Sequence, residues 1–347
     1  MTHPDDARSL PASVVVCTHN PDRALLASVL AAIGAQSLSS RDFEIVVVDN
    51  RSSPALDAHE LSRMAGRPLR VVTEERPGLT YARVAGFKAA RGDIVVFADD
   101  DNILDADYVD RAVEVGRAHP EVGVFGGRCR GAFDRPVGRR RKRFAPFLGV
   151  RDVGDAELVG EGLEWGPHEP IGAGIVVRPD IGAAYCAYVD AQQQAGAMGR
   201  SGKNLMSGED SFISRIAHCL GYKVGYFPQM ALDHVISSRR LELGYLLRLM
   251  IGHGRSYVVL HEIVHGHKPA RFDRFPTKLL YKDVVYLLRT FGLVEGVIKG
   301  LWQYGYYRQC VGPVTPSGHS LADVIAAGVE SSPRGGETPD ESGCSRV

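Results

Sequence analysis

The chain has 347 residues, 44% hydrophobic and 24% charged, which is an ordinary globular composition and enough for one large domain or two small ones. Its 41 basic and 41 acidic side chains balance, which excludes a general attraction to nucleic acid. The six cysteines show no C-x-x-C spacing and no long uncharged apolar run occurs, so a zinc cage, a disulfide framework and a spanning helix are not expected.

The first third of the chain predicts strands alternating with helices. Short β-branched runs predict the strands, and apolar residues at helical spacing predict the helices. The predicted strands span 13–17, 43–48, 69–73 and 94–98, and the predicted helices span 25–33, 54–65, 81–90 and 105–118. This alternation predicts an α/β fold, a mostly parallel sheet with right-handed crossovers and flanking helices.

Three consecutive carboxylates, Asp99, Asp100 and Asp101, follow the strand 94–98 directly. The earlier strands also end in polar residues, at 18–20, 49–50 and 73–76. Because the carboxyl ends of parallel strands meet at one sheet edge, we expect a nucleotide-sized crevice there. Close carboxylates repel unless a cation holds them, and such oxygens suit Mg²⁺ or Mn²⁺. The alternative is an Asp-rich turn in which Asp105 caps the next helix.

The phosphates of a nucleotide have no obvious glycine-rich loop to bind them. The chain contains neither G-x-G-x-x-G after its first strand nor G-x-x-x-x-G-K-[ST] anywhere. A metal on the acidic cluster is therefore the expected phosphate anchor.

The middle of the chain predicts a fifth strand at 122–125 and an irregular stretch at 131–170. That stretch contains the basic run 139–143, which is either a solvated loop or a contact for an anionic membrane surface or a phosphorylated acceptor. Gly172, Ala173 and Gly174 precede a short strand at 175–177. Such small residues let a ligand approach the backbone, or mark only a bulge.

Ser207-Gly208-Glu209-Asp210 opens a predicted helix that ends near Gly221. Ser207 and Asp210 have the spacing of a capping box, which is the structural alternative to a functional acid. A strand is predicted at 223–228, and His234 follows it, where a lone histidine is more often structural than a ligand.

Four regions follow from these patterns. We expect a flexible N-terminus at 1–11, a main α/β domain at 12–237 with a nucleotide-binding half at 12–128 and an acceptor half at 129–237, a C-terminal helical region at 238–311, and a disordered tail at 312–347. Residues 278–307 predict a core-packing or interfacial helix pair rather than a membrane span. The polar first dozen residues do not resemble a signal peptide, which favours a cytoplasmic protein.

Taken in order, these segments resemble the family 2 glycosyltransferases, which have the Rossmann-like GT-A fold. The resemblance covers about residues 12 to 257. It rests on the segments V-V-V-C-T-H-N, V-V-V-D-N, R-P-G-L-T-Y-A-R-V-A-G, A-R-G-D-I-V-V-F-A-D-D-D, G-A-G-I-V-V-R, G-E-D-S-F and D-H-V with a following R-R. It implies an inverting transfer from a nucleoside diphosphate sugar, with UDP the expected nucleotide.

The resemblance also implies residue roles. Asp101 would bind the metal directly, with Asp99 and His234 near it, and Asp210 would be the catalytic base. The remaining positions would contact the nucleotide, ribose, sugar or diphosphate: Thr18, Asp49, Arg76, Asp99, Asp100, Gly172, Ala173, Gly174, Glu209 and Arg240, with Arg239 as an alternative to Arg240.

These residue types suit a single displacement at an anomeric carbon, which needs a Lewis acid at the leaving diphosphate and one general base on the opposite face. If Asp210 capped its own helix, it would be a weaker base. The absent Q-x-x-R-W motif argues for single sugar additions, as in glycan, glycolipid or exopolysaccharide biosynthesis. The alternatives are a nucleotidyltransferase, disfavoured by the missing phosphate loop, and a catalytically silent sugar-nucleotide-binding scaffold, disfavoured because Asp101 and Asp210 are present.

The expected partners are a nucleoside diphosphate sugar and an acceptor that the sequence does not identify: a lipid-linked sugar, a glycan or a small molecule. The basic run 139–143 and the helices at 278–307 predict peripheral contact with an anionic membrane, at the inner face, as an alternative to action in solution.

Overall fold

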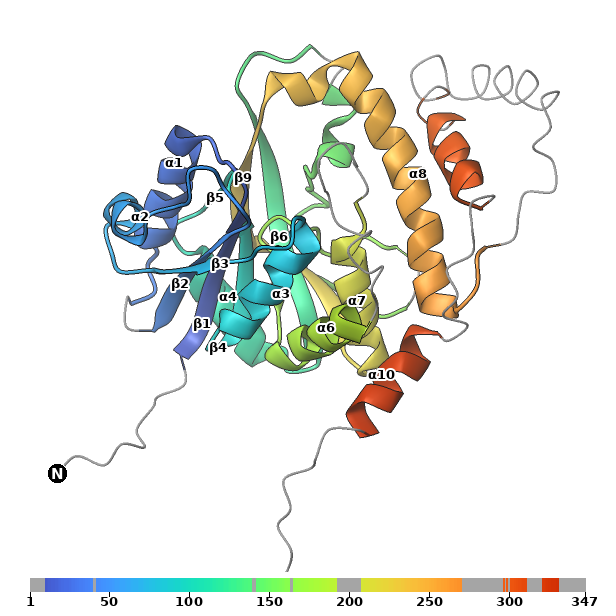
Figure 1. Ribbon diagram of the computed structural model, residues 1–347, viewed down its shortest axis with the longest axis horizontal. Helices are drawn as coiled ribbons and strands as arrows, with labels where there is room; N and C mark the ends of the chain where they lie inside the picture. Colours follow the sequence, from blue (N-terminus) through green and yellow to red (C-terminus); the bar gives the residue numbers. More distant parts are fainter. Residues whose placement is uncertain are drawn as a thin grey trace, which may run out of the picture.

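A computed structural model describes residues 10–39, 42–138, 142–162, 165–191, 207–269, 296, 298, 300–310 and 320–330. Its centre is a mixed sheet with the strand order β3-β2-β1-β4-β8-β6-β9-β5, and β7 pairs with β9 (Figure 1). The strands are β1 Leu10–Thr18, β2 Phe43–Asp49, β3 Arg70–Thr73, β4 Gly92–Asp99, β5 Asn102–Leu104, β6 Val122–Phe133, β7 Leu158–Gly160, β8 Val176–Val177 and β9 Lys223–Ile236.

The helices cover both faces of this sheet (Figure 1). They are α1 Arg23–Gly34, α2 Ala58–Ala65, α3 Leu79–Ala89, α4 Tyr108–Ala118, α6 Pro179–Ala191, α7 Glu209–Cys219, α8 Leu243–His265 and α10 Leu321–Glu330, with short 3₁₀ turns η1 Ala145–Leu148 and η3 Ser238–Leu241. The α/β class and the helical C-terminal part are therefore confirmed, and residues 300–310 are helical as well.

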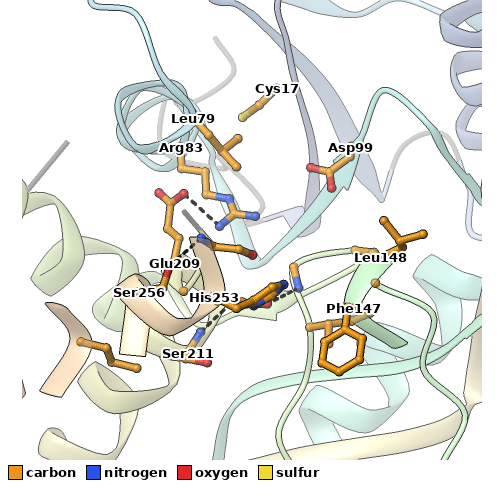
Figure 2. Close-up of a pocket in the computed structure, with 18 of the residues that line it drawn as sticks. Cys17, Leu79, Arg83, Asp99, Phe147, Leu148, Glu209, Ser211, His253 and Ser256 are labelled. Carbon is orange, nitrogen blue, oxygen red and sulfur yellow. Dashed lines mark hydrogen bonds and ion pairs between the residues drawn. The ribbon is translucent and has the colours of Figure 1, made fainter. Parts of the chain in front are cut away.

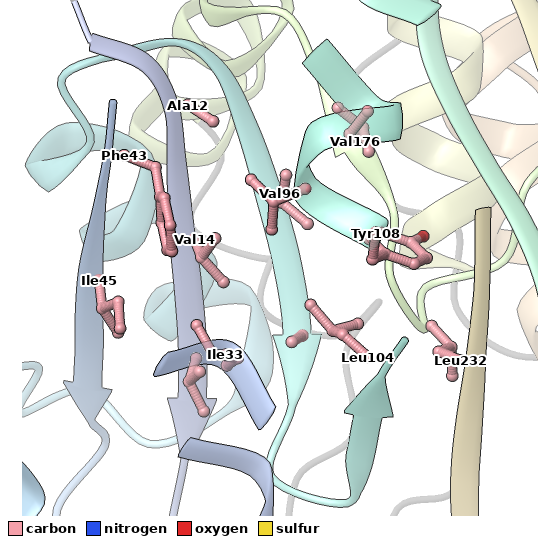
Figure 3. Close-up of a cluster of buried hydrophobic side chains, with 14 of the residues drawn as sticks. Ala12, Val14, Ile33, Phe43, Ile45, Val96, Leu104, Tyr108, Val176 and Leu232 are labelled. Atoms are coloured by element: carbon pink, nitrogen blue, oxygen red, sulfur yellow. The ribbon is translucent and has the colours of Figure 1, made fainter. Parts of the chain in front are cut away.

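The period-two geometry of the strands divides the core into two layers. In β1, Val14 and Val16 face the helices α1, α2 and α4 (Figure 3), while Val15 and Cys17 face α3, α6, α7 and α10. The central strands read as continuous apolar runs because both of their faces are buried. Burial of each such valine stabilises the fold by about 1.5–3 kcal/mol, before the cost of chain ordering.

The register brings the ends of the parallel strands to one edge. Thr18 pairs with Asp49, and Cys17 pairs with Asp99, so β1, β2 and β4 end side by side. After β4 the chain turns at once into β5, which runs antiparallel to β9 and pairs Asn102 with His234. This turn is the reason that His234, more than 130 residues away in sequence, lies beside the acidic cluster.

Several sequence expectations need correction. The predicted disordered tail is wrong for 321–330, because α10 buries Leu321 and Ile325 against α6 and α7. Helix α6 was not predicted. The predicted boundary at 128 and 129 falls inside β6, so the sheet is continuous across the two halves.

Some expectations lie wholly or partly outside the described residues. These are the segments 139–141, 278–295 and most of the tail, so membrane contact by the basic run stays a prediction. Within the parts of the chain that are described, no helix has the length and apolarity needed to cross a bilayer.

Candidate active site

A cavity of about 840 Å³ opens at the strand-end edge of the sheet. It is lined by the ends of β1 and β4, by the loop before α7, and by α8 and η1 (Figure 2). Most of the sequence-predicted residues line it: Thr18, Asp99, Asp100, Asp101, Gly172, Ala173, Glu209, Asp210, His234 and Arg240.

The acidic cluster is held by short local bonds. The Thr18 hydroxyl donates to Oδ2 of Asp100 at 2.5 Å, and Asn102 accepts from the Asp99 N–H at 3.0 Å. Burial raises the pKa of Asp100 to about 6, and the charges of Asp101 and Asp99 act in the same direction against the Thr18 hydrogen bond. The capping alternative for Asp105 is wrong, because its carboxylate instead pairs with Arg130.

Asp101, His234 and Arg240 form a triangle in the cavity wall. Oδ2 of Asp101 lies 3.4 Å from Nε2 of His234 and 3.1 Å from Nη2 of Arg240, and Nη1 of Arg240 lies 3.2 Å from the same imidazole nitrogen. Asp101 and His234 are nearly fully buried, at 7% and 6% exposed. A buried carboxylate needs a positive charge beside it, and Arg240 provides that charge for Asp101.

These donors fit a divalent metal in part. An oxygen and a nitrogen 3.4 Å apart can both reach one ion at bond lengths of about 2.0–2.2 Å. Among the described residues, however, no group of three His, Cys, Asp or Glu side chains could hold an ion. The pair Asp101 and His234 could instead hold a metal whose remaining ligands are substrate phosphates, which is a common arrangement for Mg²⁺.

Asp210 lies in the first turn of α7 and faces the same cavity. Its Oδ2 accepts the Gly172 N–H at 3.1 Å, and its Oδ1 accepts the Ser211 N–H at 2.9 Å. The predicted capping box is wrong: the N-cap is Gly208, with no side-chain cap, and Ser207 instead donates its N–H to Ser256 of α8. An ionised carboxylate has about four acceptor sites, so Asp210 can still accept from a substrate hydroxyl.

A buried ion pair connects the acidic cluster to α7. Arg83 of α3 and Glu209 are 3% and 4% exposed, with Nη1 of Arg83 3.5 Å from Oε2 of Glu209 (Figure 2). Tyr185 of α6 donates its hydroxyl to the other Glu209 oxygen. Burial lowers the pKa of Arg83, but the charges of Glu209 and Asp99 outweigh it and raise that pKa. A Cβ at Gly172 would lie 3.0 Å from Nη2 of Arg83, so the small residue there makes room for the guanidinium.

The role of Arg83 was missed from sequence, although it stands in the quoted segment Y-A-R-V-A-G. The available signal was its place between Ala82 and Val84, both of which are buried on the same helix. An arginine between two buried apolar residues needs a buried anionic partner, and the sequence alone does not identify which acid this partner is.

Three predicted residues lie outside the cavity lining. Asp49 is 1% exposed and accepts the Ser52 and Leu56 N–H groups, each at 2.9 Å. Arg76 forms an ion pair with Glu74 at 2.9 Å and stacks over Tyr81. Gly174 has a φ of +72° and its carbonyl accepts the Tyr108 hydroxyl. Their contacts with a nucleotide stay predictions.

Comparisons with known proteins identify a matching family model and several relatives. Residues 13–166 match the family model described as Glycosyl transferase family 2. The chain is 23% identical over 270 residues to the succinoglycan biosynthesis protein ExoM of Rhizobium meliloti, covering 76% of this chain and 79% of ExoM. It is 24% identical over 238 residues to the glucosyl-dolichyl phosphate glucuronosyltransferase of Haloferax volcanii, covering 68% of this chain and 72% of that protein.

Two further similarities are more limited. The uncharacterized protein y4gI of Sinorhizobium fredii is 30% identical over 162 residues, which cover 43% of this chain but 18% of y4gI. A crystal structure of GalNAc-T7 with UDP, GalNAc and Mn²⁺ is 16% identical, with 87% of this chain and 56% of that one covered and a TM-score of 0.48. The family match over residues 13–166 and the two relatives therefore support a family 2 glycosyltransferase, with this cavity as its candidate active site.

Proposed function

We propose that the protein transfers one sugar, with inversion, from a nucleoside diphosphate sugar to an acceptor hydroxyl. UDP is the nucleotide we expect. One observation carries the proposal: a single cavity brings the carboxylates Asp99, Asp100 and Asp101 together with Asp210, which comes from a different part of the chain. A lone acidic cluster would suit many nucleotide-binding proteins, whereas a second, separate acid suits a reaction that also needs a base.

The leaving group is a diphosphate, and its negative charge must be balanced as the sugar departs. A divalent metal held by Asp101 and His234, with Asp99 close by, would act as a Lewis acid on that charge. We expect Arg240, 3.1 Å from Asp101, to release this carboxylate and bond the diphosphate oxygens instead. An arginine suits that exchange because its fork can bind carboxylate and phosphate alike.

The incoming hydroxyl must lose its proton as its oxygen bonds to the anomeric carbon and the bond to the diphosphate breaks. Asp210 is the proposed acceptor of that proton. The N–H groups of Gly172 and Ser211 fix the orientation of its carboxylate. The buried Arg83–Glu209 pair anchors the start of α7, and thereby positions Asp210 next to it.

The relatives suggest a biological setting. One is named for succinoglycan biosynthesis and another for transfer to glucosyl-dolichyl phosphate. We therefore place this chain in polysaccharide or glycolipid biosynthesis, with the sugar and linkage to be found by assay.

The proposal is tested by incubating the wild type and Asp101→Asn with UDP-, GDP- and dTDP-sugars, in Mn²⁺, Mg²⁺ or EDTA. Released nucleoside diphosphate and the thermal midpoint are recorded. We expect one donor to be hydrolysed and to raise the midpoint only with metal present, and both effects to be lost in Asp101→Asn.

Asp107→Asn is the matched control, because Asp107 is a surface carboxylate that lines no part of the cavity. It should behave like the wild type. A folded wild type that responds to no donor, or equally with metal and with EDTA, would refute the proposed metal-dependent transfer.

A further inference from the structure

The cavity has an end that the proposed chemistry does not use. Helix α8 supplies His253, Tyr257 and His261, spaced by four residues and so aligned on one helix face. Trp302, from the helical residues 300–310, joins them, with its ring 5.5 Å from that of Tyr257 at an angle of 61°. We call these four side chains the α8 wall.

The α8 wall differs in charge from the rest of the cavity. Its four side chains carry no formal charge when histidine is neutral, and neither do the other α8 residues that line the cavity. The charged side chains of the described lining, such as Asp101, Arg83 and Arg240, all come from other elements. The cavity therefore has an ionic end suited to a nucleoside diphosphate and an uncharged end suited to a neutral ligand.

The wall is aromatic and also carries polar groups. Tyr257 is 42% exposed, so part of its ring is accessible to a ligand. Nδ1 of His261 lies 3.1 Å from the carbonyl of His267 and must donate to it, so in the neutral ring Nε2 is an acceptor. A sugar ring presents both C–H groups and hydroxyls. The aromatic ring faces of the wall can contact the C–H groups, and its imidazole and phenol groups can form hydrogen bonds with the hydroxyls.

The wall also adjoins the proposed base. Ser256 lies between His253 and Tyr257 in sequence, and its hydroxyl accepts the Ser207 N–H at 2.8 Å (Figure 2). Asp210 is three residues beyond Ser207 and lines the same cavity as the wall. From His253 to His265 the helix is about 18 Å long at 1.5 Å per residue, which is longer than a single sugar ring.

We propose that the α8 wall is the acceptor subsite and that it binds a neutral saccharide. This inference rests on the proposed glycosyl transfer and names the class of its acceptor. Such an acceptor differs from one recognised mainly through phosphate or carboxylate groups, since the wall contains no lysine or arginine, and from one recognised only through a lipid chain.

Tryptophan fluorescence provides a direct test, because the chain has two tryptophans and both line the cavity. Trp165→Phe leaves Trp302 as the only indole. In this background we would titrate methyl β-glucoside and cellobiose, then glucose 6-phosphate and glucuronate, and finally octanol. We expect saturable changes with the neutral saccharides alone.

Tyr257→Ala should then weaken saccharide binding about three- to tenfold, the loss expected for one aromatic contact. Tyr304→Ala is the matched control, because Tyr304 is 40% exposed and stands two residues from Trp302 but does not line the cavity. It should change the dissociation constant less than twofold.

The inference is overturned if only the charged sugars or octanol bind, if nothing binds, or if the two tyrosine variants behave alike. Donor hydrolysis by the same preparation separates this from the proposed function. Donor hydrolysis without saccharide binding defeats the acceptor inference alone, and saccharide binding without any donor response defeats the proposed transfer.

Discussion

Asp49 and Asp210 are both acids at the end of an element, yet their carboxylates have different surroundings. Asp49 is buried and both of its oxygens accept backbone N–H groups of the loop after β2. Asp210 also accepts two backbone N–H groups but faces the cavity. The same kind of hydrogen bonding therefore stabilises a loop at Asp49 and orients the carboxylate toward the cavity at Asp210.

Asp49→Asn should lower the free energy of unfolding at pH 7 by about 1–3 kcal/mol, because an amide cannot accept both N–H groups. Burial raises the pKa of Asp49, but the bonds from Ser52 and Leu56 outweigh it and hold that pKa below its ordinary value of 3.8. A lowered folded-state pKa gives stability that is present above the ordinary value and lost as the pH falls through the folded one. The difference from wild type, measured by urea unfolding, should therefore shrink below about pH 4.

Asp107→Asn, at an exposed carboxylate, should show neither effect beyond about 0.5 kcal/mol. An unchanged unfolding midpoint for Asp49→Asn together with a raised donor KM would contradict the loop-shaping account and favour contact with the base.

At the residue scale, the candidate residues that the structure brings into the cavity could be selected from the sequence where a local pattern marks them. Carboxylates after a buried strand and an acid pair at a helix start are visible without a fold. Arg83 was not found because its partner Glu209 lies 126 residues later, and only tertiary packing brings them together. The likeness of Ser207 and Asp210 to a capping box was misleading because Ser207 is bonded to α8 instead.

At the element scale, the central strands were predictable because burial on both faces leaves unbroken apolar runs. Helix α6 has a weaker pattern, since its buried positions include Gly182 and two tyrosines beside ordinary aliphatics. Helix α10 lies between segments rich in Gly, Pro and Ser, and a composition average over the whole tail concealed its apolar face. Both helices depend on the sheet's second core layer for their burial.

Helix α8 meets the helical residues 300–310 at a close backbone contact. A Cβ on Gly254 would lie 2.0 Å from the Trp302 carbonyl oxygen, whereas one on Gly244 has nothing nearer than 3.9 Å. Gly254→Ala should therefore lower the free energy of unfolding by about 1–3 kcal/mol through overpacking, despite the better helix propensity of alanine.

Gly244→Ala is the matched control and should leave stability unchanged or raise it by up to about 1 kcal/mol. Urea unfolding followed by tryptophan fluorescence measures both variants and also reports on Trp302. Equal effects of the two substitutions would mean that the contact at Gly254 is not as close as described.

At the scale of the whole molecule, one continuous sheet carries both parts of the site. The long parallel ladders set the strand ends at one edge, and the short antiparallel β5 and β8 bring His234 and the Gly172 loop to the same edge. Helix α8 then supplies part of the cavity lining. The ionic and uncharged ends of the cavity thus come from elements that are distant in sequence, and no motif within either one could reveal their juxtaposition.

The central claim is that the acidic cluster binds the donor while Asp210 removes the acceptor proton. The most direct measurement compares Asp101→Asn and Asp210→Asn, with the responsive donor, for donor binding by thermal shift and for transfer to an acceptor by product release. The account predicts that Asp101→Asn loses both, and that Asp210→Asn binds the donor normally but transfers at least about a hundredfold more slowly. Normal transfer by Asp210→Asn, or lost donor binding in that variant alone, would contradict it.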